Sequence, residues 1–374
     1  MDLVRIAVPL GLACACLIAA FVVVPHGMNA QALLYAQDDP ARLADVRLAG
    51  AFDAAAASRE IEAALAVSDI DLANSFVGLA HDRGIAVDPG LNMRVEAANS
   101  RSAAAARASK GFARGLITGE PDDLASFAGT ALGDAFVFGD IRDAVREGVR
   151  LARGEPADKL ILGLAGVGIA ITAGTYASLG AGAPARLGLT MAKAARRTGS
   201  MTARMGEWLG RSVSEVVDWT AMRNVFGGNS LIRPVMAVRA ARETIKVEKA
   251  EELFRAAGDV GTVQAKAGTQ AAMDGLKIAE GPRDLSRLAR LAEASGNRTR
   301  AIIKILGRSA LFLGTSAVSL FAWLTSAVLT ILGFFAACKR TAERLTESYL
   351  RRRKGGLGAP RNILATRYAR GCAP

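Results

Sequence analysis

Side chains that could do acid–base, nucleophilic or metal chemistry are scarce in this sequence. Its two histidines, His26 and His81, lie far apart, and it has no Gly-x-Ser-x-Gly nucleophile elbow or phosphate-binding loop. A zinc site or a Ser-His-Asp triad would need such a histidine beside further ligands or a nucleophile. His81 precedes Gly84 at the end of an apolar helical pattern, where an imidazole is favoured as a helix cap. We therefore expect no enzyme, and no catalytic, cofactor-binding or metal-binding residues.

Cysteines and paired carboxylates predict no chemical site either. The four cysteines stand near the two ends of the chain, at Cys14, Cys16, Cys338 and Cys372. The long region between them therefore holds no disulfide framework and no thiolate metal site. Two acidic pairs, Asp69/Asp71 and Asp122/Asp123, could bind a hard cation. Both stand at expected helix starts, however, where carboxylates interact favourably with the helix dipole.

Composition and charge indicate a membrane or an acidic partner. The 374 residues are 51% apolar, more than a soluble chain needs, and carry a formal net charge of +12. Residues 30–158 hold 13 basic and 20 acidic side chains, whereas residues 159–374 hold 33 basic and 14 acidic ones. This asymmetry predicts a membrane surface or an acidic partner for the second half. Nucleic acid is disfavoured, because only 5% of residues are aromatic and no basic run has aromatics interleaved.

The longest uncharged stretch, residues 309–338, predicts a transmembrane helix. It exceeds the roughly 20 residues that cross a bilayer core, and it ends at Lys339 and Arg340. Small and hydroxyl side chains recur along it at three- and four-residue steps, at Thr315, Ser319, Ala322, Ser326, Thr330, Gly333 and Ala337. Such a face suits packing against another helix.

A second apolar segment, residues 6–24, opens the chain. Pro25 and Gly27 are expected to end its helix. A cleaved signal peptide and an uncleaved signal anchor both begin in this way, and residues 30–32 offer a small-residue cleavage site. The length of the run favours the anchor, for which we take residues 1–25.

Helical periodicity continues between the two apolar ends. Residues 38–109 are Ala-rich and predict two short antiparallel helices that meet at a break, Val67-Ser68-Asp69. Gly119-Glu120-Pro121 and Gly154-Glu155-Pro156 repeat one pattern of helix stop and helix start, and an aspartate follows each to cap the new helix.

An amphipathic helix lies between these two copies. It begins at Gly139 and alternates apolar and charged residues with a helical period. Its arginines are expected to face outward, together with Asp143 and Glu147.

A Gly-rich uncharged run, residues 160–185, carries small residues at four-residue steps: Gly166, Ala170, Gly174, Ser178 and Gly182. We expect this ladder to be a helix-packing surface that another backbone approaches closely. The run also holds hydroxyl side chains and further glycines, which make its membrane insertion marginal. Two possibilities stay open: a third membrane span, or a buried helix that turns at residues 180–184 and returns as a hairpin.

Residues 133–199 as a whole resemble the pre-toxin modules of bacterial polymorphic toxins. The resemblance rests on Gly139-Asp140-x-x-Asp143, the Gly154-Glu155 turn, the run from Gly163 to Gly168, and the basic end at Lys193, Arg196 and Arg197. It implies a helical module that precedes a catalytic toxin domain. It covers under a fifth of the chain, which continues with a basic helical region and an apolar segment instead of an enzymatic domain.

Two further helix boundaries are predicted within residues 201–308. Ser212 and Glu215 match a capping box, which places a helix start at Ser212. Residues 234–257 predict a longer helix that ends at Gly258.

These features together predict an all-α, membrane-anchored protein with an N-terminal and a C-terminal transmembrane helix and a Gly-rich apolar hairpin between them. The expected segments are a signal anchor (1–25), an acidic helical domain (38–158), the Gly-rich helix or hairpin (159–200), a basic helical region (201–308), a transmembrane helix (309–338) and a basic tail (339–374). The membrane-flanking charges of the tail are Lys339, Arg340, Arg351, Arg352, Arg353 and Lys354. Because positive charge favours the cytoplasmic side, we expect two spans, with residues 25–308 periplasmic or otherwise extracytoplasmic.

The Ala- and Arg-rich composition suggests a bacterial protein of the inner (plasma) membrane. The expected function is that of a structural or interaction module of the cell envelope. Its expected partners are the lipid bilayer and another membrane or envelope protein. The alternative is a membrane-active, toxin-like effector that uses the Gly-rich hairpin.

Overall fold

The computed structural model describes residues 2–100, 132–177, 183–227, 243–312 and 316–356, and the account below concerns these residues. They are helical, as predicted, and the described ranges contain no strand beyond one isolated antiparallel bridge between Val217 and Ile245. The chain forms two compact units. The first comprises Met1–Tyr35 and Gly314–Pro374, and the second is Ala36–Leu313.

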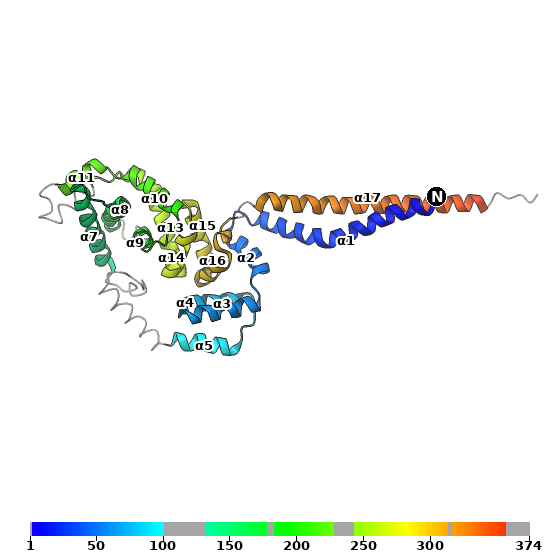
Figure 1. Cartoon of the computed structure of the whole chain (residues 1–374), viewed down its shortest axis with the longest axis horizontal. Helices are drawn as coiled ribbons and strands as arrows, with labels where there is room; N and C mark the ends of the chain where they lie inside the picture. The colour runs from blue at the N-terminus through cyan, green and yellow to red at the C-terminus, as the bar shows by residue number, and fades with distance from the viewer. Residues whose placement is uncertain (1, 101–131, 178–182, 228–242, 313–315, 357–374) are drawn as a thin grey trace, which may run out of the picture. The chain divides into compact units, whose positions relative to one another are not determined.

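The first unit is a pair of long helices, α1 (Asp2–Tyr35) and α17 (Ser316–Gly356), that lie side by side (Figure 1). Gly27 faces Ala327, where an added Cβ would lie 2.6 Å from the Ala327 Cβ. Gly333 in turn faces the Sγ atom of Cys16 at 3.8 Å. Since residue numbers fall along one helix as they rise along the other, the two helices are antiparallel.

The prediction that Pro25 and Gly27 end the first helix is wrong, because α1 continues to Tyr35. A proline inside a helix removes one backbone hydrogen bond, so the helix needs support from elsewhere. Here the support comes from α17. Gly27 allows close approach to it, and the His26 ring stacks on Trp323 with centroids 4.7 Å apart.

Large apolar side chains cover the outside of this pair. Phe21, Phe321 and Phe335 are 85%, 66% and 64% exposed. Segments Cys14–Tyr35 and Phe321–Glu347 are both long and apolar enough to cross a membrane. The small-residue face predicted along α17 is turned only partly toward α1, because Ala337 is buried whereas Ala322 and Ser326 are exposed.

The second unit is a bundle of shorter helices around one hydrophobic core. Its α-helices are α2 (Pro40–Ala51), α3 (Ala54–Ala66), α4 (Ile70–Asp82), α5 (Pro89–Asn99), α7 (Leu132–Ala152), α8 (Lys159–Ala177), α9 (Ala183–Arg197), α10 (Ala203–Val216), α11 (Trp219–Gly227), α13 (Glu251–Ala267), α14 (Thr269–Ile278), α15 (Pro282–Ser295) and α16 (Thr299–Leu306). Its 3₁₀ helices are η3 (Val247–Lys249), η4 (Gly296–Arg298) and η5 (Gly307–Ala310).

The two short helices predicted on either side of residues 67–69 are α3 and α4, whereas α2 and α5 were not predicted. The break between α3 and α4 falls at Ser68, which takes a positive φ of 58°. Asp69 then caps α4, because its side chain accepts a hydrogen bond from the backbone N–H of Leu72 at 3.1 Å. In the core of this unit, Phe52 at the end of α2 stacks on Phe76 of α4.

Arg300 joins these first helices to the last ones. It is 8% exposed and donates to both carboxylate oxygens of Asp69, at 2.5 and 2.7 Å, and to Asp274 at 2.8 Å. Burial alone would raise the pKa of Asp69, but the hydrogen bonds and charge of Arg300 hold it below its ordinary value. Two helices distant in sequence, α4 and α16, are thereby fixed to one another.

The first part of the Gly-rich run belongs to α8, a helix of the second unit. Residues 160–169 of α8 are all buried, and α8 packs against α7, α9 and α10. Gly163 makes room for Val213 of α10, and Gly168 makes room for Asp140 of α7. Bulk at either position would separate helices that now touch.

A close helix crossing joins α9 and α13. A Cβ added to Gly188 would overlap the backbone carbonyl of Ala257, and one added to Gly261 would overlap that of Pro184. Each helix thus contributes a glycine against the other's backbone. This crossing lies outside the predicted ladder.

Four further helix boundaries differ from prediction. The amphipathic helix expected to begin at Gly139 already begins at Leu132. The helix expected to start at Ser212 begins at Ala203, where Thr202 is the cap and accepts from the N–H of Met205 at 3.2 Å. The helix expected to end at Gly258 instead begins at Glu251 and runs through that glycine to Ala267. The last long helix starts at Ser316, not at residue 309.

Candidate functional site

Three carboxylates of α7 are buried on one face of the helix. Asp140, Asp143 and Glu147 are 4%, 1% and 2% exposed. Their spacing of three and four residues puts them on one helical face. The expectation that Asp143 and Glu147 face outward is therefore wrong. They face α9 and the turn before α8.

Cations of α9 meet these carboxylates. Lys193 is 5% exposed and pairs with Oδ1 of Asp140 and, at 3.5 Å, with Oδ2 of Asp143. The guanidinium of Arg197 lies 2.5 Å from the same Oδ2. We call Asp140, Asp143, Glu147, Asp158, Lys193, Arg196 and Arg197 the α7–α9 charge cluster.

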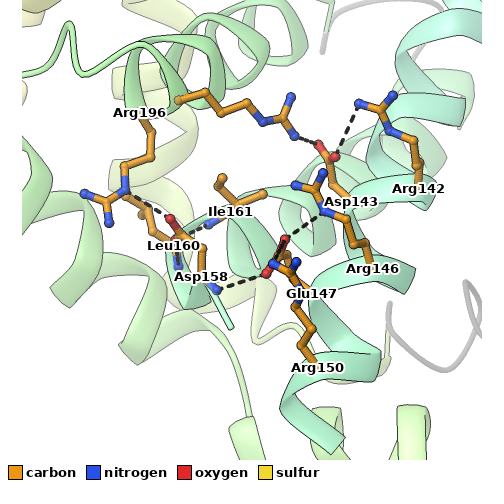
Figure 2. Close-up of polar contacts among 10 residues, drawn as sticks. Arg142, Asp143, Arg146, Glu147, Arg150, Asp158, Leu160, Ile161 and Arg196 are labelled. Atoms are coloured by element: carbon orange, nitrogen blue, oxygen red, sulfur yellow. Dashed lines mark hydrogen bonds and ion pairs between the residues drawn. The ribbon is translucent and has the colours of Figure 1, made fainter. Parts of the chain in front are cut away.

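The outer part of the cluster fixes the turn between α7 and α8 (Figure 2). Glu147 accepts from Nε of Arg146 at 2.9 Å and from the backbone N–H of Asp158 at 3.0 Å. Asp158 in turn accepts from the first free N–H groups of α8, those of Leu160 and Ile161, at 3.0 and 3.1 Å. With Gly154 at φ +72° closing α7, the predicted helix stop and start at this copy of the repeat is confirmed.

Asp158 also ties this turn to α9. Its Oδ2 atom lies 3.2 Å from Nε of Arg196, so one carboxylate caps α8 and binds α9. Figure 2 shows Arg196 reaching Asp158 while Arg146 and Arg150 gather around Glu147. The cluster therefore holds three consecutive helices together.

Burial dominates the electrostatics of Asp140. Its removal from water raises the pKa of Asp140 above the ordinary value, and the nearby charges of Lys193 and Arg186 offset only part of this effect. Asp143 adds a smaller like-charge contribution in the same direction. Oδ1 of Asp143 accepts no hydrogen bond from the described residues, and Nη2 of Arg142 lies 3.7 Å from it. The arrangement can lock helices together and take up a proton.

The contribution of Asp140 to the stability of the protein should decrease as the pH rises. Because its pKa is raised on folding from about 3.9 in an unfolded chain, the folded protein binds this proton more tightly. The stability that this group contributes is present below about pH 4 and is lost as the pH rises through the folded pKa. The free energy of unfolding of the wild type, relative to Asp140→Asn, should thus fall as the pH rises above about 4. The fall should be about 1.4 kcal/mol per unit of pKa shift, measured by denaturant titration at each pH. A difference that stays constant with pH would contradict this.

The predicted helix-packing residues are placed only in part. Gly166 is buried and faces Ile245 and Met222, where an added Cβ would lie 3.1 and 3.5 Å from side-chain atoms. Ala170 is half-buried, and Gly174 belongs to α8. Ser178 and Gly182 lie outside the described residues, so the ladder as a whole stays a prediction.

The predicted membrane-flanking residues belong to α17. Lys339 and Arg340 are exposed, and Lys339 lies 3.9 Å from Glu343. Residues 351–354 continue the same helix. Their flanking role stays a prediction.

The two histidines lie in different units. His81 stands in the last turn of α4, at the predicted helix end. His26 donates through Nδ1 to the carbonyl of Val22 at 2.7 Å. Within the described ranges, no three His, Cys, Asp or Glu side chains gather as a metal site would require.

Sequence signals could have revealed the cluster. On α7, Asp140, Asp143 and Glu147 are spaced by three and four residues, and on α9 Lys193, Arg196 and Arg197 lie within one helical turn. Two such complementary faces on neighbouring helices predict pairing. Helical amphipathicity instead assigns every charged side chain to solvent, and that rule fails here.

Comparisons of the chain with protein-family models, with curated proteins and with solved structures found no match. The resemblance of residues 133–199 to pre-toxin modules stays a prediction.

Proposed function

We propose that this chain is an integral membrane protein in which α1 and α17 form a two-helix anchor. The observation that carries the proposal is the apolar outer surface of this pair, on which Phe21, Phe321 and Phe335 are more than half exposed. Exposed apolar side chains of this kind need a cover, and lipid is a suitable one for two helices of spanning length.

The antiparallel pairing supports a topology with two spans. The two ends that join the second unit, Tyr35 and Ser316, lie at the same end of the pair, and the chain's two termini continue from the other end. Residues 339–374 carry ten basic and two acidic side chains, which favour the cytoplasm. The unit Ala36–Leu313 would then be extracytoplasmic.

The buried state of α8 further supports two spans over three. Residues 160–169 are enclosed by helices of the second unit, and a buried carboxylate, Asp140, lies against Gly168. A membrane span there would place this charge in hydrocarbon, which is costly. The Gly-rich run therefore fits a core helix.

We further propose that the second unit acts by contacts and not by catalysis, as a structural or interaction module of a bacterial cell envelope. Its partners would be the bilayer and another membrane or envelope protein. The toxin-like alternative would have to withdraw α8 from its packing, which disfavours it. Ectopic expression separates the two, since growth arrest with loss of membrane potential would support the effector and indifferent growth the module.

Membrane integration is tested by alkaline carbonate extraction of full-length protein. The wild type should stay in the membrane pellet. Leu329→Arg/Leu332→Arg places two charges on exposed positions of the proposed span, at about 2.5–3.5 kcal/mol each, and should move protein to the soluble fraction.

Leu350→Arg is the matched control, because Leu350 is exposed on α17 but lies beyond the segment Phe321–Glu347. It should remain in the pellet. Release of the wild type by carbonate would overturn the anchor.

A further inference from the structure

An outer face of arginines runs along the part of α7 whose side chains the structure describes and includes Arg153 just after it. From Gly139 to Arg153 every exposed residue is an arginine, and these are Arg142, Arg146, Arg150 and Arg153. Their side chains are 57%, 48%, 49% and 67% exposed. The three acidic residues of the same stretch are all buried. We call the four arginines the arginine face.

Buried carboxylates lie beneath Arg142, Arg146 and Arg150 and do not cancel their surface charge. Arg153 differs, because it lies 4.0 Å from Glu155, whose side chain is 51% exposed. Glu147 lies 2.9 Å from Arg146 and 3.4 Å from Arg150, yet its own side chain is 2% exposed. The guanidinium groups of Arg146 and Arg150 are thus oriented from beneath, and about half of each side chain stays exposed. Binding of a partner there costs little conformational entropy, because these side chains are already held in place.

The geometry of the face fits an extended anionic partner. Guanidinium groups bind phosphate and carboxylate through paired N–H donors. Arg142 to Arg153 span about 16 Å along a straight helix, at 1.5 Å per residue. A small anion would touch one or two of these arginines, whereas a charged surface would touch all of them.

Arg204 and Arg255 of the same unit lie beside more exposed carboxylates. Arg255 lies 2.7 Å from Glu251, whose side chain is 81% exposed. Arg204 lies 2.6 Å from Glu280, which is 27% exposed. At these positions the carboxylate reaches the surface beside its arginine and weakens the positive potential there.

We propose that the arginine face binds the phosphate headgroups of an anionic bilayer. The inference rests on the proposed membrane anchor, which keeps a bilayer at high effective concentration. Nucleic acid fits less well, because no aromatic side chain stands among the exposed residues of this stretch to stack on a base. Each basic residue near an anionic lipid surface raises the affinity of the protein for that surface by roughly fivefold.

The test measures how fast phenylglyoxal modifies individual arginines of the full chain in nanodiscs, by mass spectrometry. Discs of phosphatidylglycerol and phosphatidylcholine are compared with discs of phosphatidylcholine alone. In the anionic discs, modification of Arg142, Arg146 and Arg150 should slow by about tenfold or more. Arg204 and Arg255 in the same sample should react at unchanged rates. The slowing should vanish in about 0.5 M salt, where screening is strong.

Charge-reversal variants locate the effect without exposing a buried carboxylate. Arg142→Glu/Arg153→Glu leaves the partners of Glu147 in place, and Asp143 keeps Lys193 and Arg197. This variant should lose the protection of Arg146 and Arg150 in anionic discs. The matched control Arg204→Glu/Arg255→Glu makes the same change of charge elsewhere and should keep it.

Each other outcome overturns the proposal. Equal rates in both kinds of disc would mean that the face is merely solvated. Protection by inorganic phosphate or by an oligonucleotide in neutral discs, without protection in anionic discs, would assign it to a free phosphate or to nucleic acid. Failure of the chain to enter nanodiscs at all would overturn the anchor and this inference together, and is scored separately by co-purification with the discs.

Discussion

Gly188→Ala and Gly261→Ala should each destabilise the protein by about 3 kcal/mol, although each adds a single methyl group. At both positions the new Cβ would overlap a backbone carbonyl of the facing helix, that of Ala257 or of Pro184. A flexible side chain could move aside, but a helix backbone cannot move without separating α9 from α13. The measurement is thermal unfolding of the purified protein followed by far-ultraviolet circular dichroism.

Gly258→Ala is the matched control for this experiment. It lies on α13 with Gly261, and an added Cβ there meets nothing within 4 Å. Because alanine is the better helix former, the control should be neutral or stabilise by up to about 1 kcal/mol. If Gly261→Ala unfolds at the same temperature as Gly258→Ala, then the two helices do not cross as closely as described.

Lys193→Met should lower the free energy of unfolding by about 3–5 kcal/mol, because removing one partner of a buried ion pair leaves an uncompensated charge. Asp140 and Asp143 have side chains that are 6% and 2% exposed, and Lys193 pairs with both. Met keeps the apolar stem of lysine, so the change isolates the ammonium. The loss should be smaller at acidic pH than at pH 8, since the pKa of Asp140 is raised and its protonated carboxyl no longer needs a cation. Denaturant titration at the two pH values measures it.

Asp140→Asn/Lys193→Met tests the same pair from the other side. With one buried carboxylate and its cation both neutralised, part of the lost stability should return. Lys304→Met serves as a control at an exposed lysine and should change the stability by less than about 0.5 kcal/mol. Equal losses for Lys193→Met and Lys304→Met would contradict a buried network.

Local signals predicted the helices and several of their corners. The break at Ser68 and the stop at Gly154 were predictable from neighbouring residues alone. Each is followed by an aspartate that caps the next helix, and Gly154 can itself adopt the positive φ that ends a helix. The signals failed where tertiary contacts outweigh them. Gly258 does not end its helix, because a glycine costs a helix only about 1 kcal/mol and packing on α9 exceeds that.

Apolar runs were the least decisive signal. Residues 309–338 are uncharged throughout, yet Ala310 and Leu311 are buried in the second unit and α17 begins only at Ser316. Residues 160–169 read equally as a span or a core helix, and they are core. Hydropathy measures avoidance of water and does not tell lipid from protein interior.

The charge cluster was not predicted, because pairing depends on which helices become neighbours. Asp143 and Glu147 share the polar half of α7 with arginines, and only the docking of α9 decides that the acids are covered while Arg146 stays exposed. The spacing of acids on one helix and cations on the other was visible in the sequence. Their proximity was not.

The measurement that tests the account most directly is the topology of the chain, read with alkaline phosphatase fusions in a bacterial host. Two spans place both termini in the cytoplasm and residues 36–313 outside. A fusion after Ser102 should therefore be active and one after Pro374 inactive, because the enzyme folds only outside the cytoplasm. An active fusion at Pro374 would contradict the two-helix anchor, since it would require a third span and a Gly-rich run lying in lipid instead of in the core.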